Sequence, residues 1–416
     1  MIFNTWIYGA FLATFSILYW TVIPSKGRPM ALVLAGLVFY TYYYPVHTLL
    51  IVALLLAAYG FGAVIYRIKF EKPHGGLVSS SSIKAIFIVS LAVCLGALAY
   101  YKYLKLFASA LNHLSGVLHR ESAFTVPDLV VPLGLSFFVF EFIHYLADTY
   151  KGVAPKAGLI EFTAFGLFFP TLVSGPIKRF QPFLEQLRGQ TAFRLEFLSD
   201  GLYRIIIGIG KKVIIADSML YYTWPLANPA GVSAQDLWVA VYAFAVKIYF
   251  DFAGYSDIAI GSARLLGFRV PENFNRPYLQ PNIASFWNNW HMSLSSWIRD
   301  YLYIPLGGNR GSLFFTIRNL LISMVLCGLW HGAAWNFAVW GFYHGVGMSF
   351  HRLYRKKASA IVSYVEKLPA PLIKTVSVVL TFHFVCVGWV FFATNLRNAF
   401  YILGVLFEPL GIIFRW

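Results

Sequence analysis

The chain has 416 residues, of which 59% are hydrophobic and only 12% carry a charge. Because an ordinary soluble domain carries about 25% charged residues, this composition excludes a protein whose only solvent is water. The net charge of +16 comes from scattered basic residues, which suits basic loops beside an anionic lipid leaflet and disfavours nucleic-acid binding.

Long uncharged runs predict membrane-spanning helices. Several runs are nearly uncharged and about as long as the hydrocarbon core requires, namely 5–23, 48–66, 85–100, 237–250, 333–350, 372–392 and 399–413. Other runs are shorter or interrupted by Gly and Pro, and irregular backbone at membrane depth must pack against protein or a wet cavity. We therefore expect an all-α integral membrane protein, a polytopic multi-helix bundle of about 10–12 membrane segments, some re-entrant, that forms a central funnel.

The start of the chain predicts its orientation. The first twenty residues have no basic n-region and no small-residue cleavage site, so we expect a retained helix and not a signal peptide. One basic loop holds Lys26 and Arg28, and a second, two spans later, holds Arg67, Lys69 and Lys72. The positive-inside rule places both loops in the cytoplasm and the N-terminus outside it.

We interpret residues 1–416 as one domain with three parts. N-terminal spanning helices occupy 1–126, a catalytic core 131–340 and C-terminal helices 341–416. Only in the core do Gly, Pro, paired aromatics and charges interrupt the hydrophobic pattern repeatedly, so function is expected there.

The first notable core segment is FPTLVSGPIKRF, residues 169–180. Ser174, Gly175 and Pro176 break an apolar run directly before Lys178 and Arg179. A loop at the membrane surface explains this composition, and the two basic residues could also meet an anionic donor such as a nucleotide or phosphopantetheine.

The second segment is IYFDFAGYSDIAIGSA, residues 248–263. Asp251 and Asp257 lie in an apolar run and need partners, while Gly254 and Tyr255 suggest a break in the helix. We expect these carboxylates to be structural buried charges in a salt bridge or a helix cap.

The third segment, FWNNWHMSLSSWIRDYLYIPLGGNR at 286–310, predicts an amphipathic helix. Spacings of three and four make an aromatic stripe on one face, formed by Trp287, Trp290, Leu294, Trp297, Ile298 and Tyr301. Such a helix is shallow or lines a cavity. The residues in it that we consider for substrate contact are Trp287, Asn288, Trp290, Arg299 and Asp300. Spacing alone favours a structural role for His291, since a lone histidine among aromatics is usually a hydrogen-bonded structural residue.

The fourth segment is LWHGAAWN, residues 329–336. His331 lies at a depth where an ionisable group is costly, so an intramembrane histidine is a functional-site hypothesis by default. The small residues after it leave room for a substrate or for close helix packing. Trp330 and Asn336 are further substrate-binding candidates.

Several chemistries lack sequence support. No GxSxG elbow, HExxH motif or P-loop occurs, and we expect no metal site. Cys94, Cys327 and Cys386 lie in apolar runs without metal spacing, which is typical of buried inert thiols. Histidine chemistry remains: an imidazole can take a proton from a hydroxyl as that oxygen attacks an ester or thioester.

These segments, in this order, resemble the membrane-bound O-acyltransferase family. The family pattern has one histidine in W-H-x-S-L-S-x-W-x-R-D-Y, met at His291, and a second in W-H-G, met at His331. SGPIKRF, FDFAGYSDIAIG, PENFNRPY, PLGGNR and PLGLSFFVFEFIHYLADTY also resemble the bacterial branch that contains the alginate O-acetylase membrane subunit and the D-alanyl transfer proteins. The resemblance runs from the N-terminus to about Ile402, and the chain ends sooner than in alginate-type members.

The resemblance implies transfer of an acyl group across the bacterial inner membrane through a channel in the protein. His331 would be the general base and His291 the histidine that orients donor or acceptor, which reverses the structural interpretation of His291. The donor would be acetyl-CoA or another acyl thioester, with no bound cofactor, and the acceptor an exported cell-envelope polysaccharide. A periplasmic partner with its own serine nucleophile would complete delivery.

Three alternatives stay open. SGPIKRF is close to the D-alanyl transfer proteins of teichoic acid synthesis, whose donor is an acyl carrier protein. A proton-coupled transporter would use His291, His331, Asp251 and Asp257 as a relay, although no internal repeat typical of transporters occurs. A structural scaffold for an export complex would need neither histidine.

Overall fold

The computed structural model describes residues 5–42, 44–71, 80–117, 124–173, 175–189, 192–357 and 368–408. Lys72, Ser174 and the end of the 399–413 run lie outside these residues. Within them the ordered elements are helices, and the one extended pairing is an isolated bridge between Phe274 and Trp290. The predicted all-α fold is confirmed.

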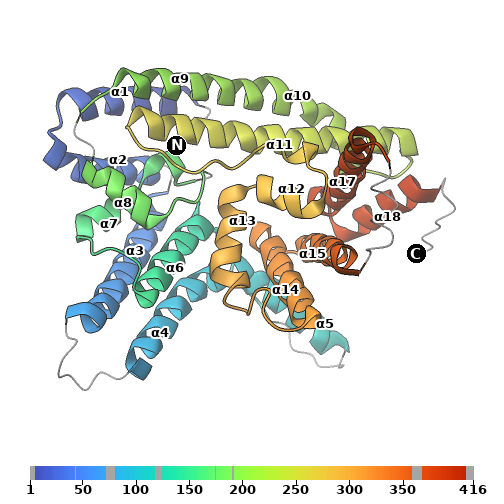
Figure 1. Ribbon diagram of the computed structural model, residues 1–416, viewed down its shortest axis with the longest axis horizontal. Coiled ribbons are helices and arrows are strands. Elements are labelled where there is room, and N and C mark those ends of the chain that lie inside the picture. Colours follow the sequence, from blue (N-terminus) through green and yellow to red (C-terminus); the bar gives the residue numbers. More distant parts are fainter. Residues whose placement is uncertain are drawn as a thin grey trace. The chain divides into compact units, whose positions relative to one another are not determined.

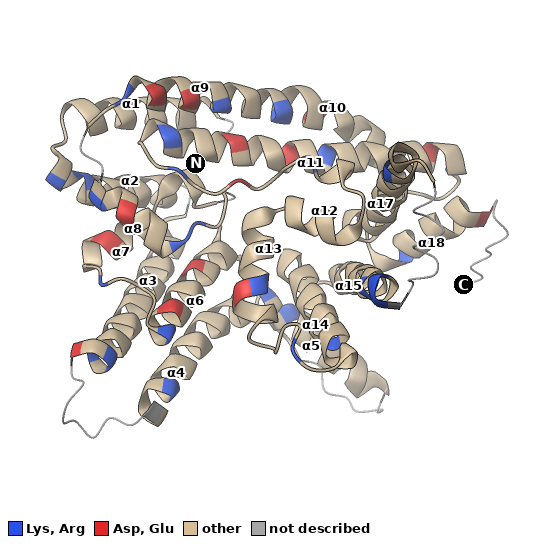
Figure 2. Cartoon of the chain, viewed as in Figure 1, with Lys and Arg blue, Asp and Glu red and all other residues tan. Residues whose placement is uncertain are grey.

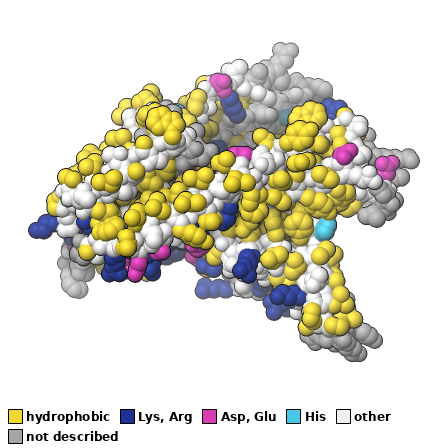
Figure 3. Space-filling model, turned by 90° about the horizontal axis from the view of Figure 1, so that it is seen from above, with side chains coloured by type: hydrophobic (Ala, Val, Ile, Leu, Met, Phe, Trp, Pro, Cys, Tyr) yellow, Lys and Arg dark blue, Asp and Glu magenta, His cyan; other side chains and the backbone are white. Residues whose placement is uncertain are grey.

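Five of the described helices are long and apolar enough to cross a membrane: Pro45–Glu71, Ser81–Val117, Ala234–Leu265, Leu313–His331 and Ala370–Ala393. Their surfaces carry large hydrophobic side chains, and Leu56, Val239 and Leu326 are each about half exposed. Figure 3 shows a face covered mostly by hydrophobic side chains, on which charged ones are sparse. The chain is therefore a multi-pass membrane protein. The count of ten to twelve segments and the funnel remain predictions.

The chain forms two compact units: unit 1 comprises residues 1–207 and 255–271, and unit 2 comprises 208–254 and 272–416. Unit 1 holds α1 (Trp6–Thr21), α2 (Arg28–Thr41), α3 (Pro45–Tyr66), α4 (Ser80–Leu98), α5 (Leu104–Val117), α6 (Leu135–Lys151), α7 (Leu159–Gly166), α8 (Phe180–Gly189) and nearly all of α9 (Leu195–Ile209). Unit 2 holds α10 (Asp217–Met219), α12 (Ile283–Asn289), α13 (Met292–Ile298), α14 (Leu313–His331), α15 (Trp335–Lys357), α17 (Ala370–Ala393) and α18 (Leu396–Phe407). The long helix α11 (Ala234–Leu265) contributes to both units.

Short irregular turns extend or join these helices. The π-helical turns are Arg67–Glu71, Ala99–Tyr103, Gly210–Ala216 and Arg299–Tyr303, and the 3-10 turns are Ser25–Gly27, Phe169–Thr171, Leu220–Leu226 and Pro277–Leu279. π-helical turns inside longer helices often mark functional sites.

In unit 1, helices α3, α4 and α6 lie side by side (Figure 1). Helix α6 is buried along most of its length, so its polar groups need partners. Glu141 accepts two hydrogen bonds from Lys178 Nζ at 2.6 and 2.8 Å, and His144 Nε2 accepts one from the Phe180 backbone N–H at 3.0 Å. Residues 178–180 (KRF) are therefore held against α6 by hydrogen bonds.

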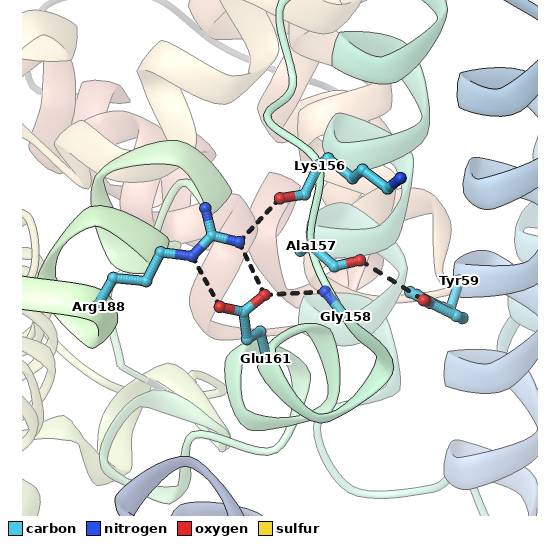
Figure 4. Close-up of polar contacts among 6 residues, drawn as sticks. All are labelled: Tyr59, Lys156, Ala157, Gly158, Glu161 and Arg188. Carbon is cyan, nitrogen blue, oxygen red and sulfur yellow. Dashed lines mark hydrogen bonds and ion pairs between the residues drawn. The ribbon is translucent and has the colours of Figure 1, made fainter. Parts of the chain in front are cut away.

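The start of α7 is held by a network around Glu161 (Figure 4). The Glu161 carboxylate receives hydrogen bonds from Arg188 Nε at 2.7 Å and Nη2 at 2.9 Å, and from the Gly158 backbone N–H at 2.8 Å. Arg188 also donates to the Lys156 carbonyl at 2.9 Å. A carboxylate in the first turn of a helix both satisfies a free N–H group and complements the helix dipole. The hydrogen bonds from Arg188 lower the pKa of Glu161.

Glu161→Gln is expected to lower the free energy of unfolding by about 0.5–1 kcal/mol near neutral pH, because the pair with Arg188 is partly solvated. Since the folded pKa lies below the unfolded value of about 4.3, the contribution is complete above that value and is lost as the pH falls through the folded pKa. The measurement is the thermal midpoint in detergent from pH 7 to pH 3. The gap between wild type and variant should close at the acid end, whereas Glu185→Gln, an exposed neighbour on α8, should match wild type throughout. A gap that widens with acid would contradict the assignment.

In unit 2, α14 and α15 form a closely packed antiparallel pair. A Cβ atom on Gly328 would lie 2.0 Å from the Phe337 carbonyl oxygen, and one on Gly341 would lie 2.1 Å from the Met324 carbonyl oxygen. Only glycine permits this backbone contact. The turn between the helices follows directly after His331, because Gly332 caps α14 in an extended conformation.

The predicted helix break at Gly254 and Tyr255 is wrong, since α11 continues from Ala234 to Leu265. The glycine instead permits close packing: a Cβ atom at Gly254 would lie 2.7 Å from the Gly208 carbonyl oxygen and 3.0 Å from the Lys212 backbone nitrogen. Sequence alone does not distinguish a glycine that ends a helix from one that admits a neighbouring backbone.

Asp251 and Asp257, the two predicted structural carboxylates of α11, have basic partners. Asp251 lies 2.9 Å from Lys212 Nζ in unit 2, and Asp257 accepts a hydrogen bond from Arg204 Nε at 2.6 Å in unit 1. Figure 2 shows acidic and basic positions along the lengths of α9 and α11. A salt bridge is one of the two structural roles expected from the sequence; the Asp257 side chain is buried, whereas the Asp251 side chain is 32% exposed.

Gly254→Ala is expected to cost about 1–3 kcal/mol of unfolding free energy, because the methyl group meets backbone that cannot rotate away. Gly210→Ala is the matched control, since its Cβ atom meets nothing within 4 Å. The loss of monodisperse protein on heating in detergent measures the difference. Equal stability of the two variants would show that the close contact at Gly254 does not contribute to stability.

Candidate active site

His291 lies at a break between two helices. The predicted single helix over 286–301 is wrong: α12 ends at Asn289, Trp290 is extended, and α13 begins at Met292. The break is fixed by the preceding chain, because Asn275 N–H donates to the Asn289 carbonyl at 3.0 Å and Met292 N–H donates to the Asn273 carbonyl at 2.9 Å. This pairing places His291 in the left-handed region, with φ 43° and ψ 54°. Histidine is among the few non-glycine residues enriched there.

The His291 side chain is buried and polar. It is 1% exposed, and neither ring nitrogen has a hydrogen-bond partner among the residues that the structure describes. His291 lies outside the five long apolar helices. Burial, with the neighbouring His331 as a second cause, lowers the pKa of His291 well below its usual value. The imidazole is therefore neutral near pH 7 and can donate or accept a hydrogen bond.

One tryptophan connects the two predicted catalytic histidines. The Trp330 ring centroid lies 6.0 Å from that of His291 and 4.6 Å from that of His331. Phe252 closes the other side of His291 at 4.6 Å, and Trp340 contacts the edge of His331 at 5.3 Å. Both imidazoles thus lie among aromatic rings; His291 is buried, whereas His331 is intermediate in burial.

A cavity of about 510 Å³ lies in the same unit. Its lining mixes apolar, hydroxyl, amide and basic groups, contributed by Trp287, Asn288, Met292, Ser295, Ser296, Ile298, Arg299, Tyr303, Asn309, Leu320, Ser323, Met324, Cys327, Met348 and Arg352. Three of the predicted substrate-binding residues are among them: Trp287, Asn288 and Arg299. Arg352 was not among the predicted site residues, because from sequence it is one of several cations in a basic loop.

The cavity wall connects to His331 through aromatic contacts. The Trp287 ring lies 5.7 Å from that of Trp340, which in turn contacts His331. His344 lies beneath both tryptophans: its Nδ1 accepts a hydrogen bond from Trp287 Nε1 at 3.3 Å, and its ring lies 4.9 Å from Trp340. No motif in the sequence marks His344; its spacing of four from Trp340 is the signal that links these two residues.

The other predicted site residues of unit 2 have identifiable neighbours. Trp290 packs in an aromatic cluster with its ring 5.0 Å from Trp389. Asp300 pairs with Arg299 at 2.9 Å. Asn336 donates to the Phe391 carbonyl at 3.1 Å, beside the Phe392 that contacts His331. The structure therefore collects nine of the predicted residues in unit 2.

Lys178 and Arg179 lie in unit 1. Lys178 is 3% exposed, and its charge is compensated by Glu141 and by the face of Phe165, whose ring centroid lies 4.6 Å from the ammonium. A cation held in this way is typical of structural pairing. Contact of either residue with the donor remains a prediction.

Lys178→Met is expected to lower the unfolding free energy by about 3–5 kcal/mol, because it leaves the Glu141 carboxylate buried without its partner. Glu141→Leu combined with Lys178→Met should recover most of that loss. Thermal unfolding in detergent and the KM for the acyl donor are both measured. A folded, stable Lys178→Met protein with only a raised KM would assign the lysine to donor binding instead.

The fold is that of a multi-pass membrane protein, and the candidate site brings the two predicted catalytic histidines close to one tryptophan. The sequence profile described as MBOAT, membrane-bound O-acyltransferase family, matches residues 32–387, and the chain belongs to this family. It is an O-acyltransferase, as predicted. Both histidines lie inside the matched range.

Curated relatives agree with this class. A probable alginate O-acetylase of Azotobacter vinelandii is 37% identical over 403 residues, which cover 96% of this chain and 76% of that protein. A peptidoglycan O-acetyltransferase of Helicobacter pylori is 32% identical over 402 residues, covering 89% of this chain and 72% of that protein. A teichoic acid D-alanyltransferase of Bacillus subtilis is 32% identical over 280 residues, covering 64% and 69%.

Proposed function

We propose that this enzyme transfers an acetyl group from a cytoplasmic acyl thioester to a hydroxyl group of an exported cell-envelope polysaccharide. The observation that carries the proposal is the meeting of His291 and His331 at Trp330, close to a cavity, in a chain similar over 96% of its length to a probable alginate O-acetylase. The peptidoglycan O-acetyltransferase supports a glycan acceptor in the same way.

In this mechanism His331 acts as the general base. Its imidazole takes the proton from the acceptor hydroxyl while that oxygen attacks the thioester carbonyl carbon, and the carbon–sulfur bond then breaks. The imidazolium returns the proton to the departing thiolate, so the enzyme ends as it began. General-base catalysis of this kind contributes about 10²- to 10⁴-fold in rate. The neutral His291 orients one of the reactants by a hydrogen bond from its buried ring.

The cavity suits the donor. Arg299 and Arg352 supply positive charge for phosphate groups, and hydroxyl and amide groups lie between apolar walls. Acetyl-CoA combines such phosphates with an uncharged thioester arm, which makes it the donor that we propose. No step requires a bound cofactor or a covalent intermediate on this chain.

The proposed activity also implies a cellular location and an orientation in the membrane. The chain would reside in the cytoplasmic membrane of a bacterium, with its N-terminus outside and its donor cavity open to the cytoplasm. The acceptor hydroxyl in the step at His331 would be the serine of a periplasmic partner, which would then pass the acetyl group to the polysaccharide as the final acceptor; no serine nucleophile motif occurs in this chain.

D-alanyl transfer from an acyl carrier protein is the second candidate, supported by the teichoic acid D-alanyltransferase relative. The two donors need different contacts with the enzyme, because a carrier protein needs a docking surface and a free nucleotide thioester does not. Competition between acetyl-CoA and a D-alanylated carrier protein separates the two candidates. The substrate is the donor that the purified enzyme turns over and whose turnover is not inhibited by the other donor.

The decisive assay follows release of coenzyme A and labelled acetyl transfer by the detergent-purified protein, with envelope components supplied. His331→Ala is expected to lower the rate about 10²- to 10⁴-fold. His291→Asn should lower it less while keeping the fold, because asparagine also adopts the left-handed conformation that this position requires. Thermal unfolding checks that each variant is folded.

His383→Ala is the matched control. His383 lies on α17 in the same unit and shares a hydrogen bond with the Tyr242 hydroxyl at 2.9 Å, outside the cavity lining. It should keep the wild-type rate. A folded His331→Ala protein with wild-type activity would refute the assigned base, and a wild type that is inert with both acetyl-CoA and an acylated carrier protein would refute the proposed function.

A further inference from the structure

Helix α14 contributes one continuous face to the cavity wall. Its lining residues are Leu320, Ser323, Met324 and Cys327, at the spacings of three and four that place side chains on one helix face. His331 follows Cys327 by four residues at the end of the same helix. Ser323, Cys327 and His331 therefore lie in successive turns, about 12 Å apart from first to last at 1.5 Å per residue.

Ser323 carries a hydroxyl that the protein does not satisfy. It is 3% exposed, and Oγ has no hydrogen-bond partner among the described residues. Buried serines elsewhere in these helices donate to the carbonyl four residues earlier, as Ser349 does to Gly345 at 2.8 Å and Ser262 to Ile258 at 2.7 Å. A buried hydroxyl that lines a cavity without such a bond is free to bond a ligand.

Cys327 is the small residue of this wall next to His331. Its thiol is free, it is 2% exposed, and it lies between the unsatisfied Ser323 and the catalytic end of the helix. Arg352 supplies charge at another part of the same cavity and forms no ion pair with any described residue. The wall thus offers, in one cavity, a cation for a phosphate, a hydroxyl for an amide and a small side chain four residues before His331 on α14.

We propose that Cys327 limits the size of the acyl group that reaches His331. Ser323 binds an amide group in the arm of the same donor. The inference rests on the proposed function, whose thioester donor occupies the cavity.

Substrate size tests the specificity role. Cys327→Ala should raise the ratio of kcat/KM for propionyl-CoA over acetyl-CoA by about tenfold or more, since one methylene is worth that much in a fitted pocket. Cys386→Ala, an equally buried thiol on α17 outside the cavity lining, should leave the ratio unchanged. A ratio that Cys327→Ala does not alter would refute the size limit, because a merely structural role lowers both rates together.

Ser323→Ala tests the hydrogen bond to the donor. It should raise the KM for acetyl-CoA several-fold with kcat nearly unchanged, the result expected when a uniform binding contact is removed. An unchanged KM would refute that contact. If wild type transfers acetyl and His331→Ala does not, failure of these tests falls on the Ser323 and Cys327 assignments alone.

Discussion

The short antiparallel pairing between residues 273–275 and 289–292 is the constraint on which the site depends. Two backbone hydrogen bonds, from Asn275 to Asn289 and from Met292 to Asn273, end α12 and start α13 on either side of His291. The Ser293 hydroxyl strengthens the join by donating to the Asn273 side chain at 2.6 Å. The imidazole is thereby held in a backbone conformation that a continuous helix excludes, and it points into an aromatic environment where its nitrogens meet no other described group.

A different feature, the close packing of α14 against α15, positions His331. Glycines at the α14 and α15 interface allow the two backbones to touch, so the helix that carries His331 ends against its partner instead of continuing. The rings of Trp330 and Trp340 both contact the His331 ring. Preorganisation of this kind costs nothing at the moment of reaction, which is where an acyl-transfer site gains most from a rigid scaffold.

Much of this could be predicted from the sequence, and the failures have physical causes. Hydropathy and charge were sufficient to predict a membrane protein. The two W-H motifs singled out His291 and His331 as candidates. The helix across His291 was predicted wrongly because the aromatic spacing fits a helix, while the break comes from residues about sixteen positions earlier. Gly254 was read as a helix break, although its lack of a side chain serves packing. No local pattern marks His344, because its hydrogen bond with Trp287 joins residues 57 positions apart.

The sequence by itself determined that the protein lies in a membrane, that it is helical, and which residues are candidates for chemistry, since these depend on composition and local spacing. The tertiary structure decided which of those residues meet. It gave Lys178 a buried carboxylate partner, brought Trp330 against both histidines, and aligned Ser323 and Cys327 with the cavity. Such pairings depend on packing between segments distant in the chain, and no local pattern encodes the geometry of that packing.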